Sequence, residues 1–418
     1  MKRFACLFSG LLLVSALPVK SLAISMQLID TTVTLPGKPV PVGRQTPRQQ
    51  DIADLAGRWF PRLPITPHDS SSLQEGNGKR FVLIIPQIGY TLQTRGLAAV
   101  LVNSPFRMPN ANMSSVTGQL SYTQNHQIIL TATSSIWSQN NRYLWTNDWR
   151  LMHYPQATYG LGMYTSTDRV INMDYAYFRF YQSLLRRLAP NLYGGLGYHL
   201  DLHWNIDSYN SRREVTRISR YENGVEGRSV SSGPIVQVVY DNRRNAINPA
   251  GGLYLSASFR ANISALGSDN TYQSALIEAR KYVHLPVSSD NILAFWSYNA
   301  LTLSGDPPFL DLPSTGWDNT GNVGRGFIQG RFRGKNLLYA ETEYRFHLTA
   351  DGLLGGVVFA NAQTVTEQPS GRFEKVVPAV GTGLRIKMNK VSRTNLSIDY
   401  GFGFDGSKGL FFNLGEVF

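Results

Sequence analysis

Beyond its first 79 residues, the chain alternates between apolar and polar positions with a period of two, in segments of about ten residues. Residues 336–348 show the pattern clearly. Leu338 and Phe346 fall on one face of this segment, whereas Glu341 and Glu343 fall on the other. Because successive side chains of a β-strand point to opposite sides, the pattern predicts strands with one face towards lipid and the other towards an aqueous lumen.

Sixteen segments follow this pattern, and clusters of Gly, Asn, Asp, Ser and Pro separate them. They cover residues 81–91, 95–104, 113–123, 126–137, 141–153, 170–183, 192–206, 233–242, 251–262, 271–284, 291–303, 336–348, 353–365, 377–389, 394–404 and 409–418. An even strand number is typical of single-chain bacterial outer-membrane barrels, and an open sheet would leave unpaired backbone groups in lipid. The pattern therefore predicts an all-β fold for residues 80–418, a 16-stranded antiparallel transmembrane β-barrel.

Aromatic residues distinguish this pattern from that of a soluble β-sandwich, whose strands also alternate. Tyr143, Trp145 and Trp149 fall on one face of a predicted strand, a spacing suited to the aromatic girdle at a membrane interface. A sandwich would not place Tyr, Trp and Phe so often at the ends of its apolar face. The aromatic spacing therefore favours the membrane barrel.

The first 79 residues have a different character. Residues 1–23 resemble an export signal, because Lys2 and Arg3 precede an apolar stretch that is too short to span a bilayer. A buried helix of a soluble protein is the alternative. Residues 24–79 are proline-rich and are expected to form a periplasmic segment, in which residues 49–60 have the spacing of a short amphipathic helix; a disordered linker fits equally well.

Composition agrees with a membrane location. Asp, Glu, Lys and Arg make up 16% of the chain, against about 25% in soluble domains, so the surface is short of charge. The formal net charge is +12 and becomes 12 − 3 = +9 without Lys2, Arg3 and Lys20 of the signal. The outward face of a barrel offers nucleic acid no access. We therefore expect the arginines of the mature chain to meet lipid phosphates or to line the lumen. We therefore predict a protein of the outer membrane of a Gram-negative bacterium, with no nucleic-acid partner.

Catalytic motifs are missing from the sequence. It contains no G-x-S-x-G, no H-E-x-x-H and no phosphate-binding P-loop, and six of its seven histidines are scattered among the predicted strands. The single cysteine, Cys6, lies in the predicted signal, so the mature chain should form no disulfide or cysteine metal site. We therefore expect no enzyme activity, no catalytic residues, no metal and no cofactor.

The longest predicted connection, residues 304–335, joins strands 11 and 12 and is rich in Gly and Arg. Glycine lets a backbone turn tightly, and a buried arginine needs a carboxylate partner. Glu341 and Glu343 on the lumenal face of the next strand could supply one. The pattern is compatible with a loop folded into the lumen, and equally with a mobile surface loop whose arginines are solvated.

Several motifs of this chain, taken in order, resemble those of the BamA/TamA outer-membrane assembly family. The loop tip Gly324-Arg325-Gly326-Phe327 and the strand Leu338-Tyr339-Ala340-Glu341-Thr342-Glu343-Tyr344-Arg345-Phe346 are similar to the sixth extracellular loop of that family and the strand after it. Further similarities lie in residues 154–162, 241–252, 381–385 and 399–401. The resemblance covers most of residues 80–418 and implies a bacterial surface antigen type barrel. It also implies that the long loop between strands 11 and 12 folds into the lumen.

The resemblance implies roles for particular residues. Arg325 would dock its guanidinium inside the barrel wall, with Glu343 as carboxylate partner and Glu341 beside it. Two positions depart from the family pattern. Asn361 stands where the family has a second acid, and Gly324 stands where it has Val or Ile. The resemblance thus implies an arginine held by one ionised partner and one amide.

The resemblance also implies a second functional feature, the seam between the first and last strands. Pro86 removes one hydrogen-bond donor from the first strand, and Phe412, Leu414 and Phe418 share a face of the last. The resemblance implies that this seam parts laterally and offers an edge to a client strand. The alternative is that Pro86 only prevents a bulge in an ordinary barrel strand.

The predicted function follows from these features. Family members carry periplasmic POTRA domains of about 75–80 residues, and the segment before the first strand has no room for one. We expect a barrel that takes part in insertion, assembly or translocation of outer-membrane proteins. Its expected partners are outer-membrane lipids, unfolded outer-membrane proteins, and periplasmic or lipoprotein partners. The alternative is a passive, anion-favouring porin or a structural barrel, in which the basic lumen selects ions.

Overall fold

The computed structural model describes residues 49–59, 82–91, 94–210, 221–287, 289–390 and 392–418. The predicted signal, residues 1–23, lies outside the described residues. The helix α1 spans Ile52–Trp59, within the segment whose spacing predicts an amphipathic helix or a linker. No helix in the described part of the chain is long and apolar enough to cross a membrane.

Strands make up nearly all of the remainder. In chain order they are β1 Leu83–Thr91, β2 Arg95–Arg107, β3 Met113–Thr123, β4 Ile128–Trp137, β5 Tyr143–His153, β6 Gln156–Thr158, β7 Ile171–Ala189, β8 Leu192–Tyr209, β9 Gly227–Asp241, β10 Gly252–Asn262, β11 Tyr272–His284, β12 Ile292–Ser304, β13 Leu337–His347, β14 Leu354–Val365, β15 Val377–Asn389, β16 Thr394–Gly403 and β17 Lys408–Leu414. Short 3-10 turns lie in the connections, among them η4, Phe309–Asp311.

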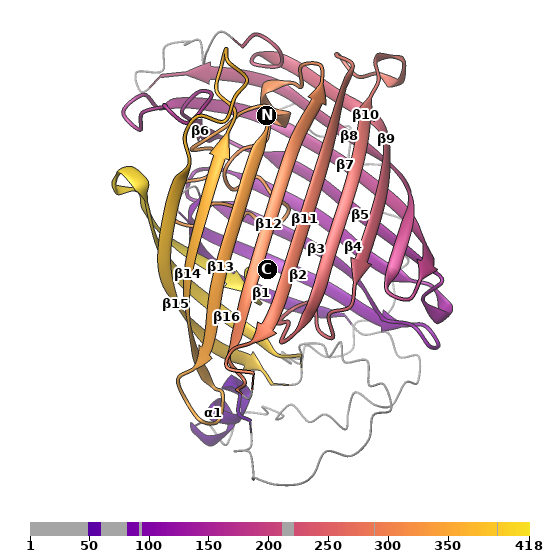
Figure 1. The fold of residues 1–418 in the computed structure, drawn as a ribbon, viewed down its shortest axis with the longest axis vertical. Helices are drawn as coiled ribbons and strands as arrows, with labels where there is room; N and C mark the ends of the chain where they lie inside the picture. The colour runs from indigo at the N-terminus through magenta and orange to yellow at the C-terminus, as the bar shows by residue number, and fades with distance from the viewer. Residues whose placement is uncertain (1–48, 60–81, 92–93, 211–220, 288, 391) are drawn as a thin grey trace.

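The strands form a single antiparallel meander that curves into a barrel (Figure 1). Each strand pairs with the next along the chain, except that β7 follows β5 in the wall and the three-residue β6 pairs only with the start of β7. The remaining ladders continue from β8 to β17. The prediction of an all-β barrel with 16 antiparallel strands is confirmed, and the barrel is nearly closed with one unsealed seam.

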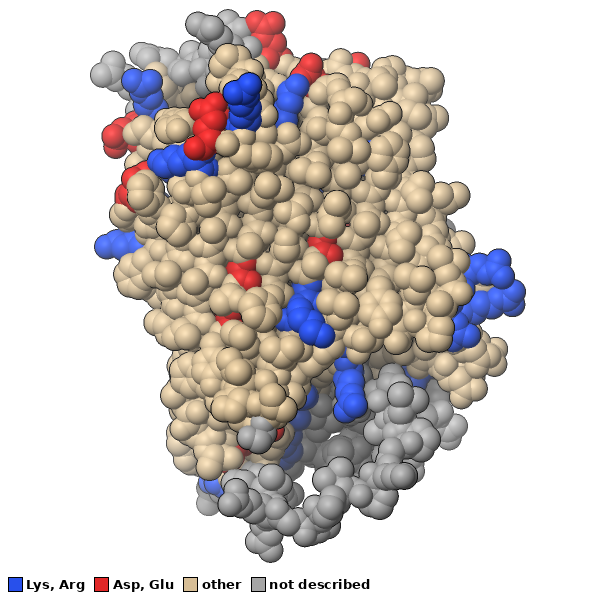
Figure 2. Space-filling view, viewed as in Figure 1, with Lys and Arg blue, Asp and Glu red and all other residues tan. Residues whose placement is uncertain are grey.

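Alternation places the two faces of the wall. In β13, Leu337, Tyr339 and Glu341 are buried while Ala340 between them is exposed. Figure 2 shows an outer face that is mostly uncharged, with most of its charged side chains towards the two ends and a few between them. Apolar side chains therefore face lipid, and the buried polar residues lie on the inward face.

The two ends of the barrel differ. The connections of residues 154–170 and 305–336 and the described residues 221–226 before β9 lie at one end, whereas short turns close the other. Helix α1 lies at the short-turn end (Figure 1), where Lys390 Nζ donates to Asp54 at 2.8 Å and Gln50 N donates to the Asp351 carbonyl at 3.1 Å. Barrels of this class turn their short connections to the periplasm.

Some strand bounds differ from the prediction. β7 extends to Ala189, β8 to Tyr209, and β9 begins at Gly227 instead of residue 233. The added residues at the start of β9 include Arg228, Ser229 and Ser231, which break the apolar alternation. Hydropathy alternation reports burial in lipid, so it misses strand residues that continue the ladder beyond the apolar band.

The last strand is present, but its predicted end at residue 418 is wrong. It ends at Leu414, and residues 415–418 leave the ladder with β16. Gly415 has φ +102°, a left-handed conformation that favours glycine, and the chain bends there. As a result Phe418 does not continue the outward face of Phe412 and Leu414.

Candidate functional site

The connection of residues 305–336 is the longest in the described part of the chain and is anchored at several places. Asn223 Nδ2 donates to the Asp306 carbonyl at 2.7 Å, and Arg331 Nη1 donates to Thr165 Oγ1 at 2.5 Å. Trp317 Nε1 donates to Gln156 Oε1 at 3.2 Å. These bonds tie the connection to the other two long loops. That the whole connection folds into the lumen stays a prediction, but its tip has well-defined contacts.

Arg325, at this tip, is fully buried against inward-facing carboxylates. Its Nη2 donates to Glu343 at 2.5 Å and also to Glu341, and its Nη1 donates to Asp399 of β16 at 2.7 Å. The guanidinium lies 3.8 Å from the centre of the Phe359 ring. A buried guanidinium with three carboxylates and an aromatic face is held by charge-assisted hydrogen bonds and a cation–π contact.

Glycines let the tip approach the wall. Gly324 and Gly326 have φ of +86° and +104°. A Cβ at Gly401 of β16 would lie 2.8 Å from the Gly326 Cα, and one at Gly403 would meet the Phe327 ring at 2.6 Å. The backbone of the tip therefore packs directly on the backbone of β16, which is possible only because both sides lack a side chain.

The structure brings together most of the residues named from the sequence and reassigns one. Asn361 does not replace an acid on the guanidinium; its Nδ2 donates to the backbone carbonyl of Arg325 at 2.9 Å. The expectation of one acid and one amide is therefore wrong, because Glu341, Glu343 and Asp399 all bind the arginine. Phe327 packs on Phe332 with ring centres 5.4 Å apart, which stiffens the tip.

Two further arginines extend this network. Arg385 of β15 binds Asp399 at 2.5 Å and Glu416 at 2.7 Å, and Arg345 of β13 binds Glu343 at 2.6 Å. We call the seven residues the tip network. They are Arg325, Arg345, Arg385, Glu341, Glu343, Asp399 and Glu416. Sequence reasoning missed Asp399, Arg385 and Glu416 as members, although the inward alternation of β15 and β16 already placed Arg385 and Asp399 on the polar face.

Residues 415–418 turn into the barrel, where they contact the tip network and the inner face of the wall instead of the seam. Phe418 is buried and stacks on Trp296 of β12 with ring centres 5.2 Å apart, and its carbonyl accepts a hydrogen bond from Arg345 Nη2 at 2.9 Å. Asn322 Nδ2 of the long connection donates to the Val417 carbonyl at 3.3 Å. The assignment of Phe418 to the lateral seam is therefore wrong; it packs inside the barrel, where Figure 1 marks the C-terminus at mid-height.

The seam itself lies between β1 and β17. No backbone ladder joins the described residues of these two strands, while each pairs fully with its other neighbour. They are also the shortest strands of the wall, with 9 and 7 residues. Pro86 is exposed on the outward face of β1, and Ile88 beside it is 90% exposed.

A second buried cluster lies on another part of the wall, around Asp201 of β8. This carboxylate accepts from Arg260 of β10 at 2.6 Å and from Tyr181 of β7 at 2.7 Å, and Arg179 of β7 lies 3.6 Å away. Tyr177 also donates to it. We call these five residues the wall network. No sequence motif pointed to it, since its members are spread over three strands.

The long connection touches this part of the wall through Asp311. Ser231 Oγ of β9 donates to Asp311 Oδ2 at 2.5 Å. Burial, together with the negative charge of Asp201, raises the pKa of Asp311 to about 7. Asp311 is therefore a carboxyl group whose charge changes near neutral pH.

Four lumenal arginines are bound by carboxylates or backbone carbonyls, whereas an anion-selective pore needs positive charges that are open to passing ions. Arg325, Arg345 and Arg385 are neutralised by carboxylates, and Arg333 donates to the carbonyls of Phe309 and Leu312 at 2.9 and 3.2 Å. Within the described residues, no group of three or more His, Cys, Asp or Glu side chains is placed to hold a metal ion. The site has the chemistry of a docking network.

Comparison with known proteins identifies the architecture. The family model described as the Omp85 superfamily domain matches residues 110–418. The chain belongs to the Omp85 superfamily. The resemblance to the BamA/TamA family is thereby confirmed, as is the predicted location in the outer membrane of a Gram-negative bacterium.

Solved structures share the fold of this Omp85 barrel. BamA from Haemophilus ducreyi lacking POTRA domains 1–3 is 15% identical, with a TM-score of 0.53 over 80% of this chain and 70% of that one. CdiB from Acinetobacter baumannii is 14% identical, with a TM-score of 0.51 over 81% and 60% of the two chains. CdiB from Escherichia coli is 12% identical, with a TM-score of 0.52 over 79% and 61%. The sequence has no significant match among curated proteins.

Proposed function

We propose that this Omp85 barrel takes part in the insertion, assembly or translocation of outer-membrane proteins, and that the client engages the seam between β1 and β17. The observation that carries the proposal is the missing ladder at this one junction of the wall. In this proposal, backbone donors and acceptors at these two edges are available to an incoming strand. A client strand would add to one edge by β-augmentation.

The lengths and side chains of the seam support this role. β1 and β17 are short, so few hydrogen bonds would have to form or break when a client enters or leaves. Ile84 and Ile88 are 65% and 90% exposed on the outward face of β1, which gives the edge an apolar surface towards lipid. An exposed edge of this kind is normally avoided in folded proteins because it templates strand pairing.

The tip network inside the lumen also contributes to the proposed function. It links the long connection, through Arg325, to Glu416 beyond the end of β17 by way of Asp399 and Arg385. In our proposal, docking of the tip holds β15–β17 in place, whereas β1 is held only by its ladder with β2. Catalytic side chains have no place in this mechanism, and we propose that the protein is not an enzyme.

The partners we propose follow from the seam. They are outer-membrane lipids and unfolded outer-membrane proteins, delivered by periplasmic or lipoprotein partners. The solved relatives include a BamA and two CdiB proteins. An insertase needs an edge that can open in the membrane, and a passive pore does not.

A reversible lock of the seam tests the proposal. We would introduce Ile88→Cys in β1 and Phe412→Cys in β17 and oxidise the pair in the reconstituted protein. The control is Val100→Cys with Leu120→Cys, two outward residues directly opposite each other in the β2–β3 ladder. The readout is the rate at which an unrelated outer-membrane barrel protein folds into the same liposomes.

We expect the seam lock to abolish the rate enhancement and a reducing agent to restore it, while the control lock has no effect. Unchanged client folding with a fully oxidised seam would reject the gate. A passive porin is the second candidate, since the lumen carries many polar side chains. It predicts steady anion-selective conductance that survives both locks, together with no effect on client folding.

A further inference from the structure

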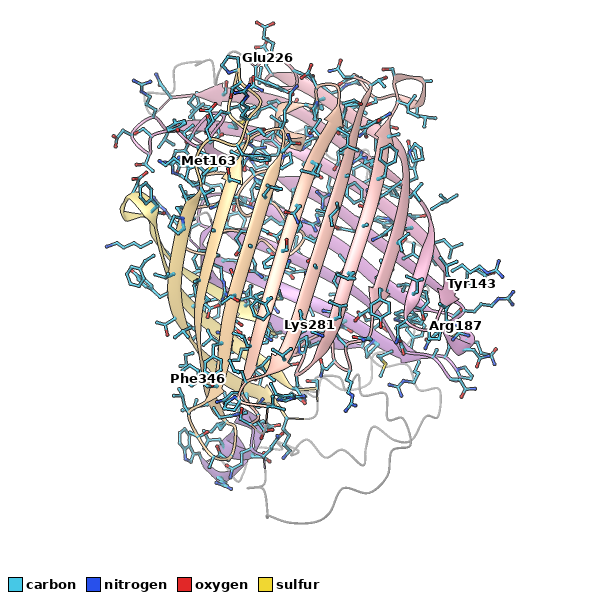
Figure 3. The ribbon with its side chains drawn as sticks, in the orientation of Figure 1. Tyr143, Met163, Arg187, Glu226, Lys281 and Phe346 are labelled. Atoms are coloured by element: carbon cyan, nitrogen blue, oxygen red, sulfur yellow. The ribbon has the colours of Figure 1, made fainter. Side chains whose placement is uncertain are left out.

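The short-turn rim between β5 and β8 carries a compact group of exposed arginines. Arg142 precedes β5, and Arg186 and Arg187 lie near the end of β7; all three are exposed. Figure 3 labels Arg187 and Tyr143 close together at the lower corner of the barrel, and Figure 2 shows a cluster of positive charge there. We call these three residues the rim arginines.

Hydrogen bonds fix the backbone that presents them. Arg187 N donates to the Arg142 carbonyl at 2.9 Å, and Arg187 Nη1 donates to the Asn140 carbonyl at 3.1 Å. Asn140 N in turn donates to the carbonyl of Pro109 at 3.2 Å, which joins this turn to the neighbouring one. The rim arginines are therefore held together by the fold, although their charges repel.

In the part of the chain that the structure describes, the turns next to the rim arginines supply no free counter-charge. The sequence has no Asp or Glu from residue 138 to 143 or from 184 to 196. The adjoining turn contains Asp241, but its carboxylate is bound by Arg243 at 2.8 Å. Three guanidinium groups in such a position attract an anion from outside the protein.

The neighbours of the rim arginines indicate which anion this is. Arg186 lies opposite Tyr143 in the β5–β7 ladder, on the outward face. Leu184 and Leu188, on the same face at either side of it, are 54% and 62% exposed, and Trp145 is 43% exposed. An acidic protein would gain nothing from these lipid-facing side chains. A phospholipid matches both features, because its phosphate meets the guanidinium groups while its acyl chains follow the apolar row.

We propose that the rim arginines form a binding site for anionic phospholipid headgroups in the periplasmic leaflet of the outer membrane. The site is independent of the seam and of the long connection. It would bind phosphatidylglycerol or cardiolipin in preference to zwitterionic lipids, and it would fix the depth of the β5–β8 side of the barrel in the membrane.

The opposite end of the barrel provides a matched control. Arg169, Arg228 and Arg372 are also exposed, but they lie at or beside the long-loop end. Acidic residues are near them in sequence, such as Asp168 beside Arg169. Substitution of three arginines by glutamine at either end removes the same charge, so only position differs.

The test measures lipid selectivity at the protein surface. The protein would be reconstituted in phosphatidylcholine vesicles with spin-labelled phosphatidylglycerol or spin-labelled phosphatidylcholine, and the motionally restricted fraction of each label would be compared. We expect the wild type to prefer phosphatidylglycerol, and 1 M NaCl to remove the preference. In R142Q/R186Q/R187Q the preference should fall by about fivefold for each arginine that touches a headgroup, whereas R169Q/R228Q/R372Q should retain it.

Two results would overturn the proposal. One is equal restriction of both labels by the wild type at low salt, which would leave an acidic protein as the ligand of these arginines. The other is an equal loss of preference in the two triple variants, which would assign the effect to net charge alone. The salt arm uses the wild type only, so the proposal remains testable if the rim variant fails to fold.

Discussion

The barrel encloses two clusters of buried charge, of which the tip network includes a cation from a connection and the wall network takes its cations from strands alone. In the wall network, Arg179 and Arg260 belong to the strands themselves and meet Asp201 of β8, from the neighbouring β7 and from β10 beyond β9. In the tip network, Arg325 comes from a connection and meets acids of β13 and β16. The first cluster therefore joins strands to strands, whereas the second joins a separable segment to the wall.

This difference indicates which of the two clusters could be broken while the barrel stays folded. The strands of the wall network are also held by continuous ladders, so its charges add to a connection that already exists. The connection has no ladder with β13–β16, so the side chains of its tip carry most of that attachment. We expect loss of Arg325 to release the tip and loss of Asp201 to weaken the wall locally.

The largest effect is expected from Arg325→Ala. It leaves Glu341, Glu343 and Asp399 buried without their common cation, and the breaking of a buried ion pair typically costs about 3–5 kcal/mol. The temperature at which the folded barrel loses its compact mobility on unheated gels should fall, and protease should cut the connection of residues 305–336. Arg169→Ala, an exposed arginine of another loop, is the control. If both variants behave as the parent does, the tip is not held by this arginine.

A smaller loss is expected from Asp201→Asn. The amide keeps one acceptor for Tyr181 or Arg260 but leaves Arg260 without its carboxylate partner, which should cost about 2–3 kcal/mol. Arg179 keeps Asp148, 3.3 Å away, as a counter-charge. Urea unfolding in lipid vesicles should show the loss. The connection should resist protease as in the parent. Cleavage there would mean that the two networks act as one unit, contrary to the comparison.

The fold was predictable because alternation and aromatic girdles are consequences of lipid on one side and water on the other. Strand number and most strand bounds followed from that physical constraint. The end of β17 did not, because the bend at Gly415 follows from interior contacts of Glu416 and Phe418 that alternation does not encode. The pattern can show which face a residue occupies, but not that the chain leaves the wall.

The site was only partly predictable for a related reason. Glu343 lies 18 residues from Arg325 and on the strand that follows the connection, so sequence order pointed to it. Asp399 lies 74 residues away on β16, and only the curvature of the barrel brings it within 2.7 Å. The wall network left no motif because its five members are spread over β7, β8 and β10, which are far apart in the sequence.

A moderate effect is expected where the tip touches the wall backbone. Gly401→Ala would place a Cβ 2.8 Å from the Gly326 Cα, and such overpacking typically costs about 1–3 kcal/mol. The control is Gly118→Ala in β3, where the nearest atom is 3.9 Å away. Protease sensitivity of the connection should rise in the first variant only. Equal behaviour of the two would show that the tip does not lie on β16 in the membrane.

The smallest effect concerns the other attachment of the connection, at Asp311. Its pKa is raised from 3.8 to about 7, so the folded protein binds a proton there that the unfolded chain has released above pH 4. The stabilisation is fully present below about pH 4, declines as pH rises above that value, and is lost once pH has passed 7. Unfolding free energy should therefore fall by about 1 kcal/mol between pH 6 and 8.

The variant Asp311→Asn separates this group from other titrations. An amide has no charge to gain, so the variant should lose the fall between pH 6 and 8 and keep any change that comes from histidines. Ser231 can still donate to its side-chain oxygen, as it does to Asp311 at 2.5 Å. A pH profile identical to that of the parent would mean that Asp311 is already ionised at pH 6. The attachment of the connection at Asp311 would then be charged over this whole pH range, as its attachment at Arg325 is.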